Sequence, residues 1–298
     1  MAGPILIGVM GPTASGKSDL AEHLADKFNA ALINADAFQM YRYMDIGTGK
    51  PLDKTRYELL DILEPSERSG AGEFINRALP QLQRSYESGR SAIVVGGTGM
   101  YIRALFEEFA DIAAPASQEL KDEIREIEEK GGLELLLRRL EEIDPHTSVD
   151  KRNPARVKRA LEKVLAPSSP SSFRLPYSNR IKLTICHDKP VLESRIATRV
   201  EKMVHNGWIS ETERLRSMGY GPDCPGFRAI GYRAMWRVLE GEIRAEVAIE
   251  ETVRDTRLYA KRQRTWLRKE PGLISLEGDT NLFLRAEEIV RSAGNKGD

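Results

Sequence analysis

The chain has few of the residues that build disulfide scaffolds and zinc sites. Its 298 residues include two cysteines, Cys186 and Cys224, and four histidines. Two isolated cysteines are too few for a disulfide framework, and neither has a partner at metal-ligand spacing. No apolar run approaches the roughly 20 residues that a membrane-spanning helix needs. With 41% hydrophobic and 30% charged residues, the composition is that of an ordinary globular protein, which we expect to be a cytoplasmic monomer.

The sequence as a whole has no net charge, but its two halves do. Residues 1–150 hold 16 lysines and arginines against 26 aspartates and glutamates, and residues 151–298 hold 29 against 19. The formal charges are therefore −10 and +10. A basic half is typical of proteins that bind a polyanion, but solvated helix faces give the same count. Charge alone leaves both explanations open.

Strand and helix patterns alternate in the first part of the chain. Short apolar runs predict strands at 5–10, 30–36 and 91–99, with a weaker one at 57–65. Amphipathic stretches between them predict helices. We therefore predict an α/β fold with a mostly parallel sheet and helices on both faces.

A helical segment interrupts this alternation. From about residue 111 the pattern is helical for about fifty residues, with breaks at Gly131-Gly132 and Pro145. The later predicted elements are a strand at 180–186, a long helix at 245–269 and a closing strand at 273–276. We assign residues 1–111 and 173–298 to one α/β core and residues 112–172 to an all-helical insertion domain.

The segment GVMGPTASGKSDL (residues 8–20) contains the pattern G-x-x-x-x-G-K-S between a predicted strand and a predicted helix. In that context backbone amides cradle phosphate oxygens, Lys17 adds a positive charge, and the Ser18 hydroxyl can ligate Mg²⁺. The predicted diphosphate- or nucleotide-binding residues are Gly11, Pro12, Thr13, Ala14, Ser15, Gly16, Lys17 and Ser18. The core is therefore P-loop NTPase-like, but the pattern does not identify the molecule that carries the phosphate.

Two further strand ends carry candidate polar side chains. Asp36 ends the strand at 30–36, and Thr98 lies in the glycine-rich turn that ends the run at 91–99. Because α/β sheets bind ligands at the carboxyl ends of their strands, we expect both residues near the P-loop. Asp36 there could hold Mg²⁺ or accept a proton from a substrate, or simply cap a turn.

The helix predicted at 245–269 has a basic face. Arg257, Lys261, Arg264 and Arg268 fall at i, i+4, i+7 and i+11. A cationic face without carboxylates suits a diphosphate or an RNA backbone, although a solvated face gives the same pattern.

Six segments resemble, in order, the motifs of the bacterial tRNA dimethylallyltransferase (tRNA isopentenyltransferase) family. They are GPTASGKS, NADAFQMYRYMDIGTGKP, VVGGTGMYIRAL, RNPARVKRALE, FRAIGYR and TRLYAKRQRTWLR, and they span roughly residues 5–270. The resemblance implies transfer of a dimethylallyl group from dimethylallyl diphosphate to the exocyclic amine of the adenine 3′ of the tRNA anticodon. It also implies that the P-loop holds the donor diphosphate, with Mg²⁺ and without nucleotide hydrolysis.

The resemblance also implies roles for single residues. Asp36 matches the general base, Thr98 a residue beside the reacting groups and the tRNA, and Arg228 an arginine near the diphosphate. The insertion is implied to grip the anticodon stem-loop. The implied tRNA contacts are Asp36, Ala37, Phe38, Gln39, Thr98, Lys121, Ala155, Arg156, Val157, Lys158 and Arg159. Ala37, Lys121 and Ala155 differ from the residues common in the family. These differences affect the implied contacts with tRNA and leave the implied catalytic residues unchanged.

Two other functions fit parts of the pattern. A P-loop kinase for a nucleoside or small molecule would share the fold and the P-loop, with Asp36 as base toward a hydroxyl group. A non-catalytic tRNA-binding protein would share the basic half. The helical insertion with RNPARVKR argues against the kinase, and the intact P-loop with Asp36 and Thr98 argues against the binding protein.

Overall fold

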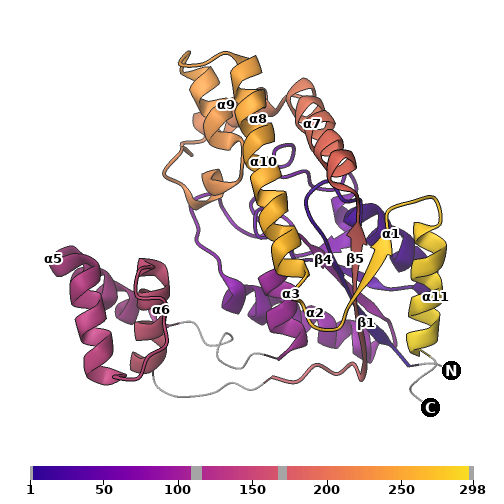
Figure 1. The fold of residues 1–298 in the computed structure, drawn as a ribbon, viewed down its shortest axis with the longest axis horizontal. Helices are drawn as coiled ribbons and strands as arrows, with labels where there is room; N and C mark the ends of the chain where they lie inside the picture. Colours follow the sequence, from indigo (N-terminus) through magenta and orange to yellow (C-terminus); the bar gives the residue numbers. More distant parts are fainter. Residues whose placement is uncertain (1–2, 109–115, 167–172, 295–298) are drawn as a thin grey trace. The chain divides into compact units, whose positions relative to one another are not determined.

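The computed structural model describes residues 3–108, 116–166 and 173–294. The chain forms two compact units: a core unit of residues 1–107 and 174–298, and a helical unit of residues 108–173 (Figure 1). The predicted domain boundaries at 111/112 and 172/173 involve residues outside the described ranges and stay predictions.

The core unit is built on one six-stranded sheet in which every pairing is parallel. Its strands are β1 (Ile5–Met10), β2 (Ala31–Asn34), β3 (Tyr57–Glu58), β4 (Ala92–Gly96), β5 (Asn179–Cys186) and β6 (Leu273–Glu277). The order across the sheet is β3-β2-β4-β1-β5-β6. β1 and β4 are buried along their whole length, because the sheet is covered on both faces.

Helices cover both faces of the sheet, as the sequence predicts. The helices of the core unit are α1 (Lys17–Phe28), α2 (Ala71–Glu87), α3 (Gly99–Phe106), α7 (Lys189–His205), α8 (Trp208–Ser217), α9 (Tyr232–Leu239), α10 (Ala245–Leu267) and α11 (Leu282–Gly294), with the short 3-10 helices η1 (Lys54–Arg56) and η2 (Pro225–Arg228). α1 and α11 pack on one face, where Leu24 and Val290 join the same apolar core. α2 and α3 cover the other face, and Phe74 stacks on Tyr101 between them. The predicted α/β class is confirmed.

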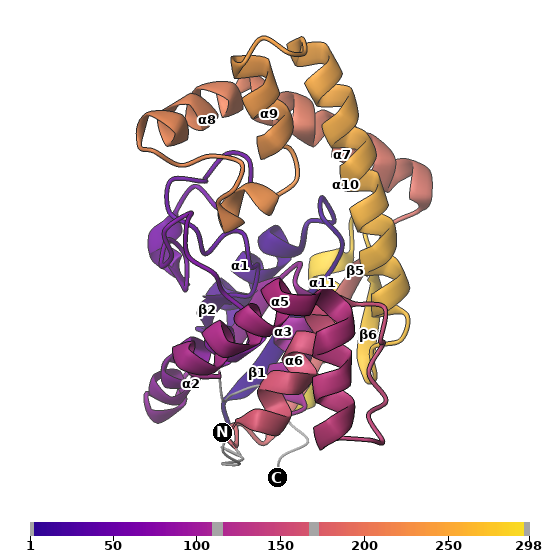
Figure 2. The ribbon, with the colours of Figure 1, turned by 90° about the vertical axis from the view of Figure 1, so that its left-hand side faces the viewer.

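Four helices gather beyond the carboxyl ends of the strands. Figures 1 and 2 both show α7, α8 and α9 grouped with the upper part of α10 on that side of the sheet. α10 runs from this group back toward the sheet, and it contacts α7, α9 and α3. No helix within the described ranges is both long and apolar enough to cross a membrane.

Two predicted details of the core are wrong. The strand predicted at 57–65 is only two residues long, because Leu59 and Asp61 adopt positive φ angles of 66° and 52°, which no strand tolerates. The strand at 273–276 does not close the fold. It is followed by α11, whose Ala286 and Val290 are buried in the core beside α1.

The helical unit contains α5 (Gln118–Ile143) and α6 (Pro154–Leu165) among its described residues. The predicted break at Gly131-Gly132 is present, since both residues leave helical geometry. Leu136 and Leu140 of α5 pack against Val157 and Leu161 of α6 in a small apolar core of their own. The predicted all-helical insertion is confirmed for the part of the unit that the structure describes.

Candidate active site

Three neighbouring strands of the core end side by side. β2, β4 and β1 are adjacent in the sheet, with Asn34 in register with Val95 and Met10 in register with Gly96. The segments that follow these strands therefore leave the sheet at one edge. They are the P-loop after β1, the Asp36 segment after β2 and the glycine turn after β4.

The backbone of the P-loop is fixed through its carbonyl groups. Arg195 Nε donates to the carbonyl oxygen of Ala14, and His187 Nε2 donates to that of Ser15, each at 2.8 Å. Gly16 precedes α1 with a φ of 91°, and no side chain caps the start of that helix. An uncapped helix start presents N–H groups and partial positive charge, so this geometry fits an anion.

Lys17 and Arg199 bring two cations to the same place from distant parts of the chain. Burial lowers the pKa of Lys17 to about 8, while Asp36 raises it and Arg199 lowers it further. Burial also lowers the pKa of Arg199, against opposite effects of Asp36 and Asp19. Among the described residues, neither cation has a carboxylate within salt-bridge distance. Both charges are therefore left to attract an anionic ligand.

Asp36 faces the glycine turn that follows β4. Its Oδ1 accepts the N–H of Phe38 at 3.1 Å, and a Cβ atom at Gly97 would lie 3.0 Å from its Oδ2. The same Cβ would lie 2.9 Å from Gln263 Nε2 and 3.9 Å from Lys17 Nζ. Glycine at position 97 therefore lets three functional side chains converge beside the turn.

Two side chains connect the three loops. Gln263 of α10 accepts the N–H of Thr13 through Oε1 at 3.0 Å and donates from Nε2 to the carbonyl oxygen of Gly97 at 2.9 Å. Thr98 Oγ1 accepts the N–H of Ala37 at 3.0 Å. The P-loop is thus bonded to the β4 turn, and the β4 turn to the segment that carries Asp36.

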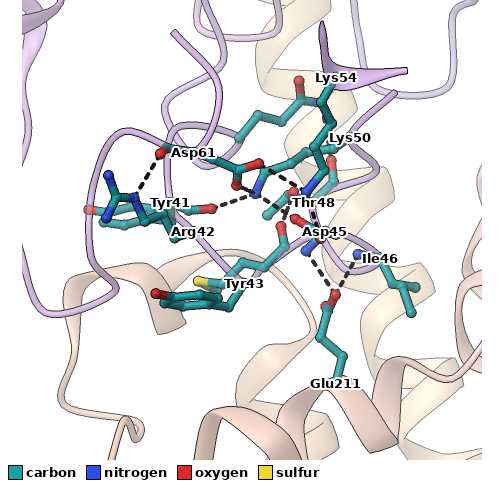
Figure 3. Close-up of polar contacts among 12 residues, drawn as sticks. Tyr41, Arg42, Tyr43, Asp45, Ile46, Thr48, Lys50, Lys54, Asp61 and Glu211 are labelled. Carbon is teal, nitrogen blue, oxygen red and sulfur yellow. Dashed lines mark hydrogen bonds and ion pairs between the residues drawn. The ribbon is translucent and has the colours of Figure 1, made fainter. Parts of the chain in front are cut away.

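Buried charges hold the long segment between β2 and β3 (Figure 3). The Lys50 side chain is fully buried, and its Nζ donates to the Tyr41 carbonyl at 2.5 Å, to Asp45 at 2.8 Å and to Asp61 at 2.5 Å. Lys54 bonds the same two carboxylates at 2.7 and 2.9 Å. Partial burial raises the pKa of Asp45, but the hydrogen bonds from the two lysines outweigh it and lower that pKa.

Arg228, which the sequence analysis placed near the diphosphate, ends η2 and is exposed. Arg228 interacts electrostatically with Tyr41. Burial raises the pKa of Tyr41, and the charge of Arg228 lowers it in part. The arginine found beside Lys17 and Asp36 is Arg199 of α7. Arg199 is therefore the arginine whose charge acts on Lys17, and the place of Arg228 near the diphosphate stays a prediction.

The predicted tRNA-binding residues of the helical unit lie on α5 and α6. Asn153 Oδ1 caps α6 by accepting the N–H groups of Ala155 and Arg156 at 3.1 and 3.2 Å. Ala155 and Arg156 are exposed, and Lys121 is partly exposed in the first turn of α5. Val157 is fully buried in the core of the unit, so its side chain supports the segment from inside and does not face an RNA.

The cations of this segment are paired within the helical unit. The ion pairs are Arg156–Asp150 at 3.3 Å, Lys158–Glu128 at 2.7 Å and Arg159–Glu162 at 2.7 Å. The Arg156–Asp150 pair is exposed and the other two are partly exposed, and surface pairs of this kind contribute little to stability, about 0–1 kcal/mol each.

Two residues of this site, Arg199 and Gln263, carry no clear functional signal in the sequence. Arg199 lies in α7 with no glycine or motif around it, and its one signal is its spacing of four residues from Arg195 on the same helix. Gln263 lies inside the segment TRLYAKRQRTWLR, where only the arginines and the lysine form a pattern that predicts a function. Both residues reach the site through the packing of helices from the far half of the chain.

Comparison with known proteins adds independent findings. The sequence model of the IPP transferase family matches residues 39–270. The tRNA dimethylallyltransferase 2 of Geotalea uraniireducens is 39% identical over 279 residues, covering 89% of this chain and 89% of that protein. The crystal structure of a full-length tRNA isopentenylpyrophosphate transferase from Bacillus halodurans matches with a TM-score of 0.71 and 32% identity, covering 98% of this chain and 97% of that chain. A crystal structure of a eukaryotic dimethylallyltransferase acting on tRNA matches with a TM-score of 0.81 and 25% identity, covering 97% of this chain and 79% of that chain.

Proposed function

The chain belongs to the IPP transferase family, and from that premise we propose that it is a tRNA dimethylallyltransferase. It transfers the dimethylallyl group of dimethylallyl diphosphate to the exocyclic amine of the adenine 3′ of the tRNA anticodon. The observation that supports this most directly is the convergence of Lys17, Asp36 and Gln263 around Gly97 at the edge of the sheet. Cations for a leaving diphosphate and a carboxylate for an amine proton meet there.

In the reaction the bond between the allylic carbon and the diphosphate oxygen breaks, and a carbon–nitrogen bond to the adenine amine forms. The diphosphate leaves with the electron pair of the broken bond, so negative charge develops on its oxygen. Lys17, Arg199 and the N–H groups at the start of α1 are the groups that stabilise this charge. Their partial burial strengthens the interaction, because the local dielectric is lower than in water.

Asp36 accepts the proton that the amine loses. An exocyclic adenine amine is a weak nucleophile, and a positioned base contributes about 10²–10⁴-fold to such a step. The Phe38 N–H holds Oδ1, which leaves Oδ2 beside the β4 turn to take the proton. Thr98 accepts the Ala37 N–H, so its own hydroxyl proton remains to donate to a substrate atom.

Mg²⁺ fits the donor side of this site. Within the described residues no group of three or more His, Cys, Asp or Glu could hold a metal. Mg²⁺ bound to phosphates needs only one or two protein oxygens and keeps several waters, and the Ser18 hydroxyl at the start of α1 is such an oxygen. Bound there, Mg²⁺ would neutralise part of the diphosphate charge.

The tRNA contacts are proposed for the Asp36–Gln39 segment, for Thr98, and for Lys121, Ala155, Arg156, Lys158 and Arg159, which are all exposed or partly exposed. Arg228 is proposed to act near the diphosphate. The target adenine must leave the stack of the anticodon loop to reach Asp36, which costs a few kcal/mol. All these residues come from one chain, so we propose a monomer as the active form. Because tRNA is the acceptor, we place the activity in the cytoplasm.

The test is mass spectrometry of tRNA nucleosides after incubation with the protein, Mg²⁺ and dimethylallyl diphosphate. We expect adenosine at the position 3′ of the anticodon to gain one C5H8 unit. A parallel incubation with ATP and a small hydroxyl acceptor tests the kinase alternative, and we expect no phosphate transfer. A tRNA without the mass gain would contradict the proposed function.

A further inference from the structure

A buried carboxylate, Glu211 of α8, holds the backbone of a loop far away in the sequence. It accepts the N–H groups of Asp45 at 2.8 Å, Ile46 at 2.7 Å and Gly47 at 3.1 Å, and the hydroxyl of Tyr232 at 2.7 Å. Figure 3 shows its head pointing at this backbone. Glu211 is only 4% exposed, and a buried charge is stable only when donors surround it. Its four donors satisfy that condition.

The residues directly after this loop hold Gln39. Gln39 Nε2 donates to the carbonyl oxygens of Thr48 at 3.3 Å and Gly49 at 3.2 Å. Both neighbours are acceptors, so the NH2 end of the amide must face them. Both of its hydrogens are used, and Oε1 has no hydrogen bond to the residues that the structure describes. Gln39 therefore offers a substrate an acceptor and no donor.

The same segment is packed between two helices. A Cβ atom at Gly47 would overlap the Trp208 ring of α8, and a Cβ atom at Gly49 would overlap the Arg199 guanidinium of α7. The backbone at both positions lies directly against these side chains. A shift of the segment would therefore change the surroundings of Gln39 and of Arg199 together.

We propose that Glu211 is a positioning residue for recognition of the acceptor base. By fixing residues 45–47, it keeps the Thr48 and Gly49 carbonyls where they hold the Gln39 amide, so that Oε1 accepts a hydrogen bond from an exocyclic amine. Adenine presents an amine, whereas hypoxanthine presents a carbonyl oxygen at the same place, which Oε1 repels. This inference rests on the proposed function, since it assumes that the target base lies beside Gln39.

The test compares Glu211→Gln with Glu213→Gln, an exposed glutamate on the same helix. A glutamine at 211 loses the negative charge and turns an NH2 group toward donors, so the loop loses part of its anchor. We expect kcat/KM for tRNA to fall about 10–100-fold, and KM for dimethylallyl diphosphate to rise by a smaller factor, because Gly49 also lies against Arg199. Glu213→Gln is expected to leave both values unchanged.

Two measurements separate positioning from a merely structural role. The first is the ratio of affinities for anticodon stem-loops with adenine or hypoxanthine at the target position, which we expect to shrink in Glu211→Gln. The second is a double-mutant cycle with Gln39→Ala, in which the two effects should be less than additive, because one acts through the other. If Glu211→Gln does not fold, Tyr232→Phe removes one of the four hydrogen bonds and serves as the milder variant, with the same shifts at smaller size.

The outcomes are distinguishable. If the wild-type protein modifies tRNA but both base affinities and kcat/KM in Glu211→Gln match Glu213→Gln, the positioning role is wrong and the proposed function stands. Fully additive effects with Gln39→Ala overturn it as well. If the wild-type protein does not modify tRNA at all, the proposed function itself fails.

Discussion

Two short runs of backbone N–H groups in this molecule are used in opposite ways. At the start of α1 no side chain caps the N–H groups, and Lys17 stands beside them. At residues 45–47 the N–H groups are capped by a carboxylate of the protein itself, Glu211. Both runs attract negative charge for the same reason, because aligned N–H dipoles point at one spot. Only the uncapped run is left to bind a substrate.

This difference explains why the start of α1 can bind an anion, whereas residues 45–47 hold a fixed backbone conformation. A cap that belongs to the chain is present in every state, so the segment it holds stays fixed and can orient Gln39. An uncapped run gains its partner only when a ligand binds, so its binding energy is available for catalysis. Changes on the two sides should therefore have separable effects on donor and acceptor.

The largest expected effect belongs to Asp36, which lies between the two runs. Asp36→Asn keeps the shape of the side chain and removes its basicity. We expect the single-turnover rate to fall about 10²–10⁴-fold with both substrates saturating, because the amine loses its base. Donor binding that weakens and recovers with added Mg²⁺ would instead make Asp36 a metal ligand, and a near-normal rate would remove it from the mechanism.

The uncapped run is tested by Lys17→Met. Methionine keeps most of the volume and removes the charge, so stabilisation of the leaving diphosphate is lost. We expect kcat/KM for dimethylallyl diphosphate to fall about 10²–10³-fold, with tRNA affinity unchanged in a filter-binding assay. Lys27→Met, at the other end of the same helix and half exposed, is the matched control. A loss of tRNA binding in Lys17→Met would show that the two substrates are assigned to the wrong sides.

The capped segment is tested by Lys50→Met. This variant removes three hydrogen bonds from a fully buried ammonium group and leaves Asp45 and Asp61 with only Lys54. We expect the free energy of unfolding to fall by about 2 kcal/mol, because two partly buried carboxylates lose a partner. Lys54→Met, whose lysine is 36% exposed, should cost less in the same urea titration. Equal losses in the two variants would mean that burial of Lys50 is not what holds the segment.

The smallest expected effect is a pH dependence on the donor side. The pKa of Lys17 is lowered to about 8, so the charged form that binds diphosphate is lost as pH rises through that value. We expect KM for the donor to rise about fivefold between pH 8 and pH 9 and to approach about tenfold per pH unit above that. tRNA affinity should not follow this profile, and Lys17→Met should abolish it. A flat donor KM between pH 7 and 9 would place the lysine outside the binding step.

The sequence allows prediction of those features whose cause is local. The P-loop pattern needs only eight neighbouring residues, because Gly11 and Gly16 are required by the turn itself and Lys17 and Ser18 begin the helix. The alternation of strands and helices predicts the parallel sheet for a similar reason, since each strand is a short apolar run. The resemblance to a family supplied the substrates, which local patterns do not identify.

Features that depend on distant packing were not predicted. Glu211 is hydrogen-bonded to Asp45, which lies 166 residues away in the sequence, and Gln263 to Thr13, which lies 250 residues away. No local sequence pattern predicts either partner. A glutamate on a helix reads as a solvated residue until the fold shows that it is buried. Val157 illustrates the reverse case: it lies in a basic segment that indicates RNA contact, but tertiary packing turns its side chain inward.

The side-chain amide of Gln263 makes two hydrogen bonds at once: its oxygen binds the P-loop and its nitrogen binds the β4 turn. A rotation of this amide that improves one hydrogen bond breaks the other. The positions of the two loops are therefore coupled. A donor that orders the P-loop also restricts the turn that carries Thr98. The conformational entropy that is lost when tRNA binds is therefore smaller once the donor is bound. The two substrates are therefore expected to bind with positive cooperativity, equal in both directions by thermodynamic linkage.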